Sequence, residues 1–204
     1  MSSFDSKAKK WDKDPGRRKR AREVAEGIRQ NIKITPEMKA LEYGCGTGLL
    51  SFQLHTHFDK IVLADISRGM LEVAEEKIAQ KKVENMETRR LNLTEEPVPD
   101  ETFDVIFTLM TLHHIKDIKG LLSKFNLLLS TSGYLCIADL VKEDGSFHGK
   151  KFEGHNGFAK EELVSHLERE GFKINYYEII FKRRKVIRGK EKEFPIFLLI
   201  AENI

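Results

Sequence analysis

Three glycines, Gly44, Gly46 and Gly48, follow directly on a short apolar stretch and are the residues in this chain whose spacing most clearly suggests a ligand site. Glycine has no Cβ and accepts positive φ, so such a loop lets a ligand approach the backbone closely. The dinucleotide fingerprint GxGxxG needs its third glycine five residues after the first, where Leu49 stands here, and the Gly-Lys-Ser/Thr of a phosphate-binding P-loop is absent. A glycine-rich strand–helix turn without a ligand is the alternative.

Polar and apolar residues at the ends of the next two apolar segments favour a ligand. Asp65 ends the segment 60–67, and a carboxylate there can accept hydrogen bonds from both hydroxyls of a ribose. Asn92 and Leu93 end the segment 87–93 and suit the amino edge and the face of an adenine. Each alone is also compatible with a helix cap or a turn. Their order, one set per strand end, predicts an adenosine-binding edge.

Strand and helix patterns alternate along the chain and must position these residues. We predict strands over 39–44, 60–67, 87–93, 103–110, 134–140, 173–182 and 194–202, and helices over 16–32, 47–58, 68–82, 117–133 and 159–172. This order predicts an α/β fold: a doubly wound, seven-stranded, mostly parallel sheet with an antiparallel C-terminal strand, helices on both faces and an N-terminal helical arm. The last two strands have no helix between them, so we expect them to add an antiparallel edge.

Length and composition indicate a single domain over residues 1–204. We divide it into an N-terminal helical arm or lid (1–36), a cofactor-binding core (37–140) and an acceptor loop with the C-terminal strand pair (141–204). No apolar run reaches the roughly 20 residues that span a bilayer, and the N-terminus carries no apolar signal region, so we expect a cytoplasmic protein without a membrane partner. Cys45 and Cys136 form no CxxC pair, so no metal site is predicted. The oligomeric state, monomer or dimer, is left open.

The sequence resembles the class I S-adenosylmethionine-dependent methyltransferases, in particular the type 11-like small-molecule group. The stretch "LEYGCGTG" is similar to the first motif of that family, "LADISRGML" to its second, and "NLTEEPVPDETFDVIFTLMTLHHI" to its long third-to-fourth motif. Asn92 stands where the family more often has Asp. The resemblance implies S-adenosyl-L-methionine as methyl donor, held by Glu42, Gly44, Cys45, Gly46, Gly48, Asp65, Ile66, Met70, Asn92, Leu93, Thr108 and Leu109.

Within this resemblance the glycine loop would line the methionine moiety, and Glu42 would steady the loop or hold the methionine amino group. Asp65 would hold the ribose, and Ile66, Met70 and Leu93 would sandwich the adenine. Thr108 and Leu109 would contact the donor from the fourth strand.

The sequence indicates the residues that would contact the acceptor less specifically than those that would bind the donor. A sulfonium methyl is already electrophilic, so a general base is needed only for an acceptor that carries a proton. We take His113, Asp139 and His155 as the candidate catalytic residues, with His114 and His148 as further bases; each could also cap a helix or pack. The loop 147–158 is expected to shape a pocket for a small-molecule acceptor, or else to be a mobile loop. An aromatic arm carrying Phe4 and Trp11 is expected to close over the donor, or else to be a frayed terminus.

Three other functions compete with methylation of a small molecule. Basic residues over 17–29 and 182–190 would suit an RNA or protein methyltransferase, but the net charge is only +3 and the fourth strand lacks an NPPY signature, so we do not expect a nucleic-acid partner. A non-catalytic cofactor-binding scaffold and a nicotinamide oxidoreductase are the remaining alternatives.

Overall fold

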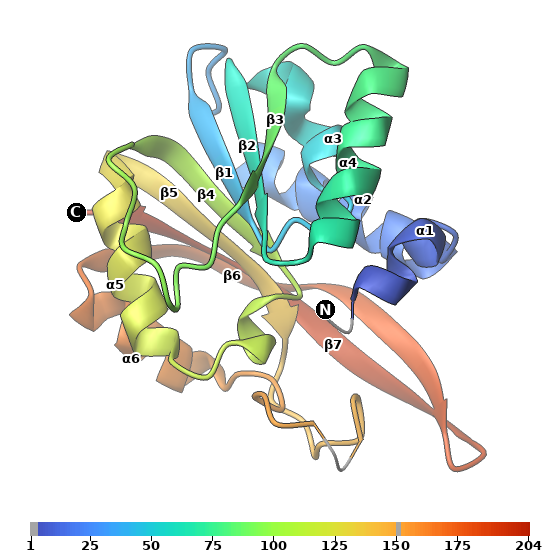
Figure 1. The fold of residues 1–204 in the computed structure, drawn as a ribbon. Helices are drawn as coiled ribbons and strands as arrows, with labels where there is room; N and C mark the ends of the chain where they lie inside the picture. Colours follow the sequence, from blue (N-terminus) through green and yellow to red (C-terminus); the bar gives the residue numbers. More distant parts are fainter. Residues whose placement is uncertain (1–3, 150–151) are drawn as a thin grey trace.

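The computed structural model describes residues 4–149 and 152–204, and its centre is one seven-stranded sheet (Figure 1). The strand order is β3-β2-β1-β4-β5-β7-β6. Their bounds are β1 Lys39–Tyr43, β2 Lys60–Asp65, β3 Met86–Arg90, β4 Phe103–Leu109, β5 Leu129–Leu140, β6 Phe172–Ile187 and β7 Lys190–Asn203. Neighbours among β1 to β5 pair parallel, whereas β7 pairs antiparallel with both β5 and β6. The predicted fold class is confirmed, with the antiparallel strand second from the edge and β6 outermost.

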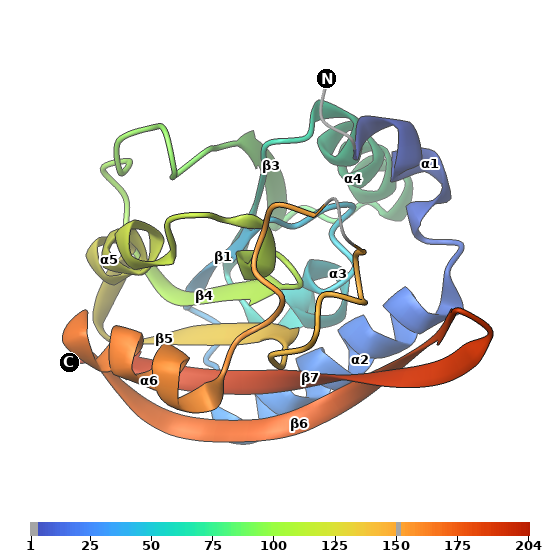
Figure 2. The ribbon, with the colours of Figure 1, turned by 90° about the horizontal axis from the view of Figure 1, so that it is seen from below.

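Helices cover both faces of the sheet (Figure 2). Their bounds are α1 Ala8–Trp11, α2 Pro15–Asn31, α3 Ser51–Leu54, α4 Arg68–Lys81, α5 Ile118–Leu128 and α6 Lys160–Arg169, with single 3-10 turns at Asp5–Lys7, His55–His57 and Leu112–His114. Side chains of α2, α3 and α4 pack in one core cluster, and those of α5 and α6 pack in another. Alternate residues of β2 point to opposite faces, so Ile61 and Leu63 join the first cluster and Val62 and Ala64 the second.

Side-chain caps fix where three of these helices begin. Asp14 accepts from the backbone N–H of Gly16 (2.8 Å) just before α2, and Ser67 accepts from that of Met70 (3.3 Å) at α4. Asp117 accepts from that of Gly120 (3.0 Å) in the same way at α5. A cap of this kind satisfies a donor that the first turn leaves without an intrahelical partner.

The helix predicted over 117–133 ends five residues early. It stops at Leu128, and the next residues open β5, with Leu129 opposite Phe103 of β4. Asn203 reinforces this extended backbone, because its side-chain amide donates to the carbonyls of Leu129 (3.2 Å) and Ser130 (3.3 Å). Tertiary pairing therefore overrides the helical spacing of the leucines here.

Two further expected segments differ in length from the structure. The segment after the glycine loop forms only the short α3 and a 3-10 turn rather than a helix over 47–58. The last two strands are longer than predicted, because the stretch read as a basic turn continues the hairpin to a tight turn at Arg188 and Gly189, where φ is 49° and 79°. In Figure 1 this hairpin projects beyond the rest of the sheet.

The N-terminal arm folds back on the molecule. Figure 1 shows α1 beside α4, at the edge of the sheet where the parallel strands end, and the chain then continues into α2. Among the described helices none is both long and apolar enough to cross a membrane.

Candidate functional site

The glycine loop joins β1 to α3 and bends as the sequence requires. Gly44, Gly46 and Gly48 all have positive φ, at 73°, 53° and 78°. A Cβ at Gly48 would lie 2.7 Å from Cδ2 of Leu63, so a larger residue there would force the Leu63 side chain to shift and would be strained by the positive φ. At Gly46, apart from its chain neighbours, the described residues place a single heavy atom within 4 Å of such a Cβ, Nε1 of Trp11 at 3.7 Å. The backbone of Gly46 is therefore the point of the loop that a ligand can approach.

Asp65 ends β2 beside this loop. Its two carboxylate oxygens accept from the N–H groups of Gly46 (2.8 Å) and Ser67 (2.8 Å). Burial raises the pKa of this carboxyl, against the lowering effect of these backbone hydrogen bonds. The next residue, Ile66, has a side chain that is 49% exposed. A carboxylate, an open backbone and a solvent-facing apolar side chain thus meet at the end of β2.

The other residues expected around an adenine lie deeper. Met70 and Leu93 are both buried, and the backbone N–H of Leu93 donates to the hydroxyl of Tyr43 (3.2 Å). Because β3 ends at Arg90, Asn92 lies in the loop beyond it, where its side-chain oxygen accepts from the N–H (3.1 Å) and the hydroxyl (2.6 Å) of Thr94. Met70 and Leu93 are therefore buried side chains, whereas the Asn92 side chain turns toward Thr94.

The end of β4 completes this side. Thr108 is 1% exposed, and its hydroxyl has no hydrogen-bond partner within residues 4–149 and 152–204. Leu109 is partly buried against the α2–α4 face, and Met110 follows with a positive φ of 57°. Thr111 then turns back, and its hydroxyl donates to the carbonyl of Gly44 (3.1 Å). The glycine loop and the β4 end are therefore joined directly.

Glu42 lies beneath the loop rather than at its surface. It is 2% exposed and accepts from both the backbone N–H of Ser51 (3.0 Å) and the Ser51 hydroxyl. Burial raises the pKa of Glu42 to about 8, outweighing the lowering effect of these hydrogen bonds. Burial likewise raises the pKa of the neighbouring Cys45 thiol well above its ordinary value. Both side chains are thus in their neutral forms at neutral pH, and Glu42 anchors α3.

His113 and Asp139 come together at the ends of β4 and β5. The His113 Nδ1 lies 2.6 Å from an oxygen of Asp139, and the other Asp139 oxygen accepts from the backbone N–H of His113 (3.3 Å). The backbone N–H of Leu140 also donates to Asp139 (2.7 Å). Both side chains are 1% exposed, and the His113 Nε2 has no partner among the described residues. The carboxylate therefore fixes the ring so that its second nitrogen presents a lone pair.

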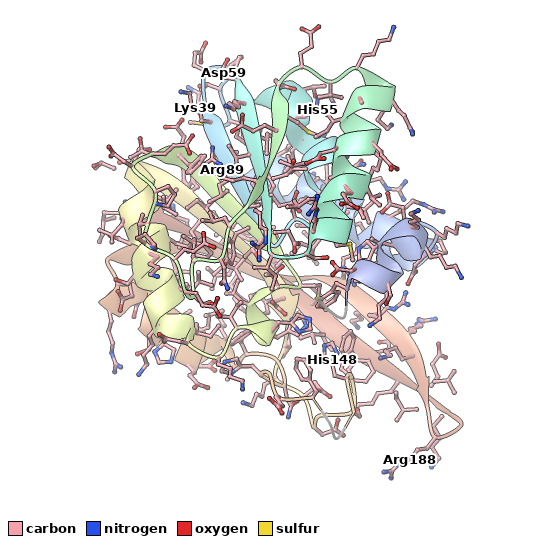
Figure 3. All side chains as sticks on the ribbon, in the orientation of Figure 1. Lys39, His55, Asp59, Arg89, His148 and Arg188 are labelled. Carbon is pink, nitrogen blue, oxygen red and sulfur yellow. The ribbon has the colours of Figure 1, made fainter. Side chains whose placement is uncertain are left out.

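Two more imidazoles surround this pair. The ring of His113 lies 4.2 Å from that of His114 and 4.9 Å from that of His148, centroid to centroid. Burial, followed by the charge of the neighbouring histidine, lowers the pKa of His114 to about 3 and that of His148 to about 4. Figure 3 labels His148 on the loop beyond the ends of the parallel strands.

His155, the third candidate catalytic residue, is not part of this group. Its backbone N–H donates to the carbonyl of His113 (2.7 Å), but its ring nitrogen Nε2 lies 3.3 Å from the carbonyl oxygen of Lys116 and its ring packs near Phe158. It holds the loop 147–158 in place. Of that loop, residues 150 and 151 lie outside the described residues.

Two acidic residues of the N-terminal arm, Asp5 and Asp12, hydrogen-bond to the start of α4 and to the glycine loop. Asp5 accepts from the Ser67 hydroxyl (2.6 Å) and the N–H of Gly69 (3.1 Å) at the start of α4. Asp12 accepts from the Thr47 hydroxyl (2.5 Å) of the glycine loop and pairs with Lys77 of α4 (2.7 Å). The arm therefore bridges the loop and α4.

One basic residue of α2, Arg20, is buried near the site. Arg20 belongs to the basic face expected on the N-terminal helix, yet it is 8% exposed, and burial lowers its pKa to about 10. Its charge is close enough to Asp139 to favour the protonated form. The helix thus turns one arginine inward, as expected for a residue four positions before Val24 and eight before Ile28, which lie on the buried face.

The strand order and the covering helices define a class of protein: a Rossmann-like domain, a fold in which ligands characteristically bind at the carboxyl ends of the parallel strands. A family model described as a methyltransferase domain matches residues 34–193. The chain belongs to that family, within the class I S-adenosylmethionine-dependent methyltransferases.

Relatives and solved structures agree with this assignment. The chain is 34% identical over 145 residues to an uncharacterized methyltransferase of Schizosaccharomyces pombe, covering 63% of this chain and 51% of that protein. It is 27% identical over 148 residues to a phosphoethanolamine N-methyltransferase of Triticum aestivum, covering 72% of this chain and 27% of that protein. The chain thus spans about half or less of these relatives. A SAM-dependent methyltransferase from Aquifex aeolicus has the same fold, with a TM-score of 0.70 and 24% identity over 98% of both chains.

Proposed function

We propose that this chain binds S-adenosylmethionine at the carboxyl edge of β1, β2 and β4 and transfers its methyl group to a small-molecule acceptor. The pairing of Asp65 with the amide of Gly46 carries the proposal. It sets a largely buried carboxylate, able to accept from ribose hydroxyls, directly beside the backbone that a ligand can approach. The family to which the chain belongs supports the identity of the donor.

The residues at this edge fit such a donor in both polarity and space. The buried Thr108 hydroxyl has no partner within the part of the chain that the structure describes, and Ile66 leaves an apolar face exposed. An amphipathic ligand would satisfy both. The open backbone at Gly46 leaves room for its approach. When bound, the donor supplies an electrophilic methyl carbon on a sulfonium, so the protein's main task is orientation.

Each predicted donor contact keeps its proposed role. Asp65 binds the ribose hydroxyls, the apolar side chains of Ile66, Met70 and Leu93 pack against the adenine, and Asn92 hydrogen-bonds to the adenine amino edge. The remaining donor contacts are Glu42, Gly44, Cys45, Gly46, Gly48, Thr108 and Leu109. For Glu42 the contact with Ser51 favours the first of its two proposed roles, that of steadying the loop.

The N-terminal arm is proposed as a lid over the donor. Its contacts through Asp5 and Asp12 reach both sides of the expected donor site, α4 and the glycine loop. Hydrogen bonds of Asp5 and Asp12 and the ion pair of Asp12 with Lys77 hold it there. Such a closure excludes water and can open for exchange of donor and product.

On the acceptor side, His113 and Asp139 are proposed to act as a unit. Asp139 positions the ring, and the Nε2 lone pair of His113 accepts the ionisable hydrogen of an acceptor. His155 serves the same site by holding the loop against His113.

A small-molecule acceptor is favoured over RNA by the charges of the β6–β7 hairpin. Arg184 pairs with Glu193 (2.9 Å), and Lys182 lies 3.7 Å from the same carboxylate, so the basic run is partly neutralised across the hairpin. The wheat relative is named a phosphoethanolamine N-methyltransferase. A relative from Shewanella putrefaciens, 32% identical over 132 residues that cover 61% of this chain and 53% of that protein, is named a ubiquinone/menaquinone biosynthesis C-methyltransferase. These names support a small acceptor.

Calorimetric titration with S-adenosylmethionine and with its demethylated product tests the proposal. The Asp65→Ala variant loses a charge-assisted hydrogen bond of about 1.5–3 kcal/mol, so we expect the donor affinity to fall roughly 10- to 150-fold. Asp59→Ala is the matched control, since Asp59 is exposed and Figure 3 shows it at the opposite edge of the sheet. Equal donor affinity in the two variants would remove Asp65 from the ribose site. A screen of metabolite pools and total RNA with labelled donor then identifies the acceptor, and binding without turnover on any acceptor would indicate a scaffold.

A further inference from the structure

Three histidines from two separate segments meet at the acceptor side of the sheet. His113 and His114 belong to the 3-10 turn after β4, and His148 comes from the loop after β5. The ring centroids of His114 and His148 are 5.3 Å apart, and one nitrogen from each of the three residues can be chosen so that all lie within 4.8 Å of one another. Such convergence of imidazole nitrogens is the first requirement of a metal centre.

The second observation is the state of His113. Its side chain is 1% exposed, its Nδ1 is held at 2.6 Å by Asp139, and its Nε2 is buried without a partner among the residues described. A buried nitrogen without a partner costs free energy unless a ligand satisfies it. Metal-binding histidines characteristically give their other ring N–H to a carboxylate in this way, which fixes the ring and raises its basicity.

Aromatic side chains pack against the three rings, of which His148 remains exposed. His148 stacks on Phe152 at 4.0 Å and lies 4.8 Å from Phe147, while Phe4 of the arm meets His114 edge-on at 5.3 Å. An apolar shell limits access of water and strengthens electrostatic interactions at the nitrogens. Imidazole ligands without a carboxylate select zinc, copper, nickel or iron rather than magnesium or calcium.

We propose that His113, His114 and His148 form a binding site for one divalent ion of the zinc class, with Asp139 as the residue that positions His113. Tetrahedral zinc places its nitrogen ligands about 3.4 Å apart, so the exposed His148 and its loop would move inward on the ion. Three protein ligands leave the fourth position open, which is the arrangement of catalytic rather than structural zinc sites.

The role of this ion rests on the proposed function. An acceptor S–H or O–H bound at the open position has its pKa lowered and releases its proton to solvent. The acceptor class selected is then a thiol or a hydroxyl, unlike the nitrogen and carbon methylation for which the wheat and Shewanella relatives are named, and the ion replaces the free His113 imidazole as the group that acidifies the acceptor. The metal site itself does not depend on that role, because it is defined by the protein's own nitrogens.

Titration of the metal-stripped, full-length protein with Co²⁺ and Zn²⁺ tests the site. We expect one Co²⁺ per chain with the visible ligand-field bands of a four-coordinate nitrogen site, displaced by Zn²⁺. His148→Ala, an exposed loop residue whose loss leaves the core intact, should weaken binding at least 100-fold, and Asp139→Asn roughly 10- to 100-fold. His55→Ala is the control, since Figure 3 shows His55 far from His148, and it should leave binding unchanged.

Absence of stoichiometric Co²⁺ binding by the wild-type protein would overturn the proposal, as would equal affinities of His148→Ala and His55→Ala. Circular dichroism establishes that each variant is folded. Donor affinity measured calorimetrically on the same metal-free samples keeps the two hypotheses apart. Metal binding without donor binding would contradict the proposed function alone, and donor binding without metal binding would contradict this inference alone.

Discussion

The buried carboxyl of Glu42 makes a quantitative prediction about stability and pH. Burial raises its pKa to about 8 in the folded protein, from 4.5 in an unperturbed carboxyl. Between these two values the folded chain carries a proton that the unfolded chain has released. Stability contributed by this group is therefore fully present below pH 4.5 and is lost as the pH rises toward 8.

The magnitude follows from the two pKa values. Linkage gives a loss of roughly 1 kcal/mol at pH 5 and roughly 3 kcal/mol at pH 7, both relative to low pH, so stability on the order of 2 kcal/mol disappears between pH 5 and pH 7. Glu42→Gln keeps the shape of the protonated carboxyl and can still accept from Ser51, but it does not titrate. Relative to the wild type, the variant should gain that amount over the interval.

Urea unfolding at pH 5, 6, 7 and 8 measures the difference. Subtracting the wild-type curve from that of Glu42→Gln cancels every other titrating group, including His114 and His148. The control Glu76→Gln changes an exposed carboxyl on α4 and should show no comparable slope. If the difference between Glu42→Gln and the wild type is the same at pH 5 and pH 7, Glu42 is not protonated in the folded state and the argument from burial is wrong.

Three further predictions concern the backbone and the arm. Gly48→Ala should lower the free energy of unfolding by about 1–3 kcal/mol, because the φ of Gly48 is 78° and the new Cβ would meet Leu63. Urea unfolding measures this loss. An unchanged free energy of unfolding would show that the loop relaxes freely. Asp14→Ala removes the cap of α2 and should cost about 1 kcal/mol in the same assay, with Asp14→Ser largely restoring it; a loss that serine does not restore would place the effect elsewhere. Asp12→Ala frees the arm from the glycine loop and from Lys77. Stopped-flow competition should then show that the donor is released faster by roughly an order of magnitude, while the free energy of unfolding changes by less than about 1 kcal/mol. An unchanged release rate would argue against a lid.

The donor side of the site could be predicted from sequence because it follows the order of the strands. Parallel strands end at one edge, so residues at strand ends are neighbours wherever the alternation of strands and helices is clear. This reasoning placed Asp65 beside the glycine loop, and the structure joins them through Gly46. It placed His113 near Asp139 for the same reason.

Features that depend on long-range packing could not be predicted. His148 joins His113 because the loop after β5 folds back, and no local pattern fixes such a path. The leucines before Leu129 look helical throughout, and only the pairing with β4 ends that helix. In each case a partner distant in sequence decides the outcome.

Trp11 is the sole tryptophan of the chain, and its placement above Gly46 has a practical consequence. Its indole also lies 3.7 Å from the guanidinium carbon of Arg17, which would quench or shift its emission in a defined way. Any occupant of the space above the loop, and any swing of the arm, must change the surroundings of that indole. The fluorescence of Trp11 therefore reports on binding above the glycine loop and on movement of the arm, and it can be measured without labels at micromolar concentration.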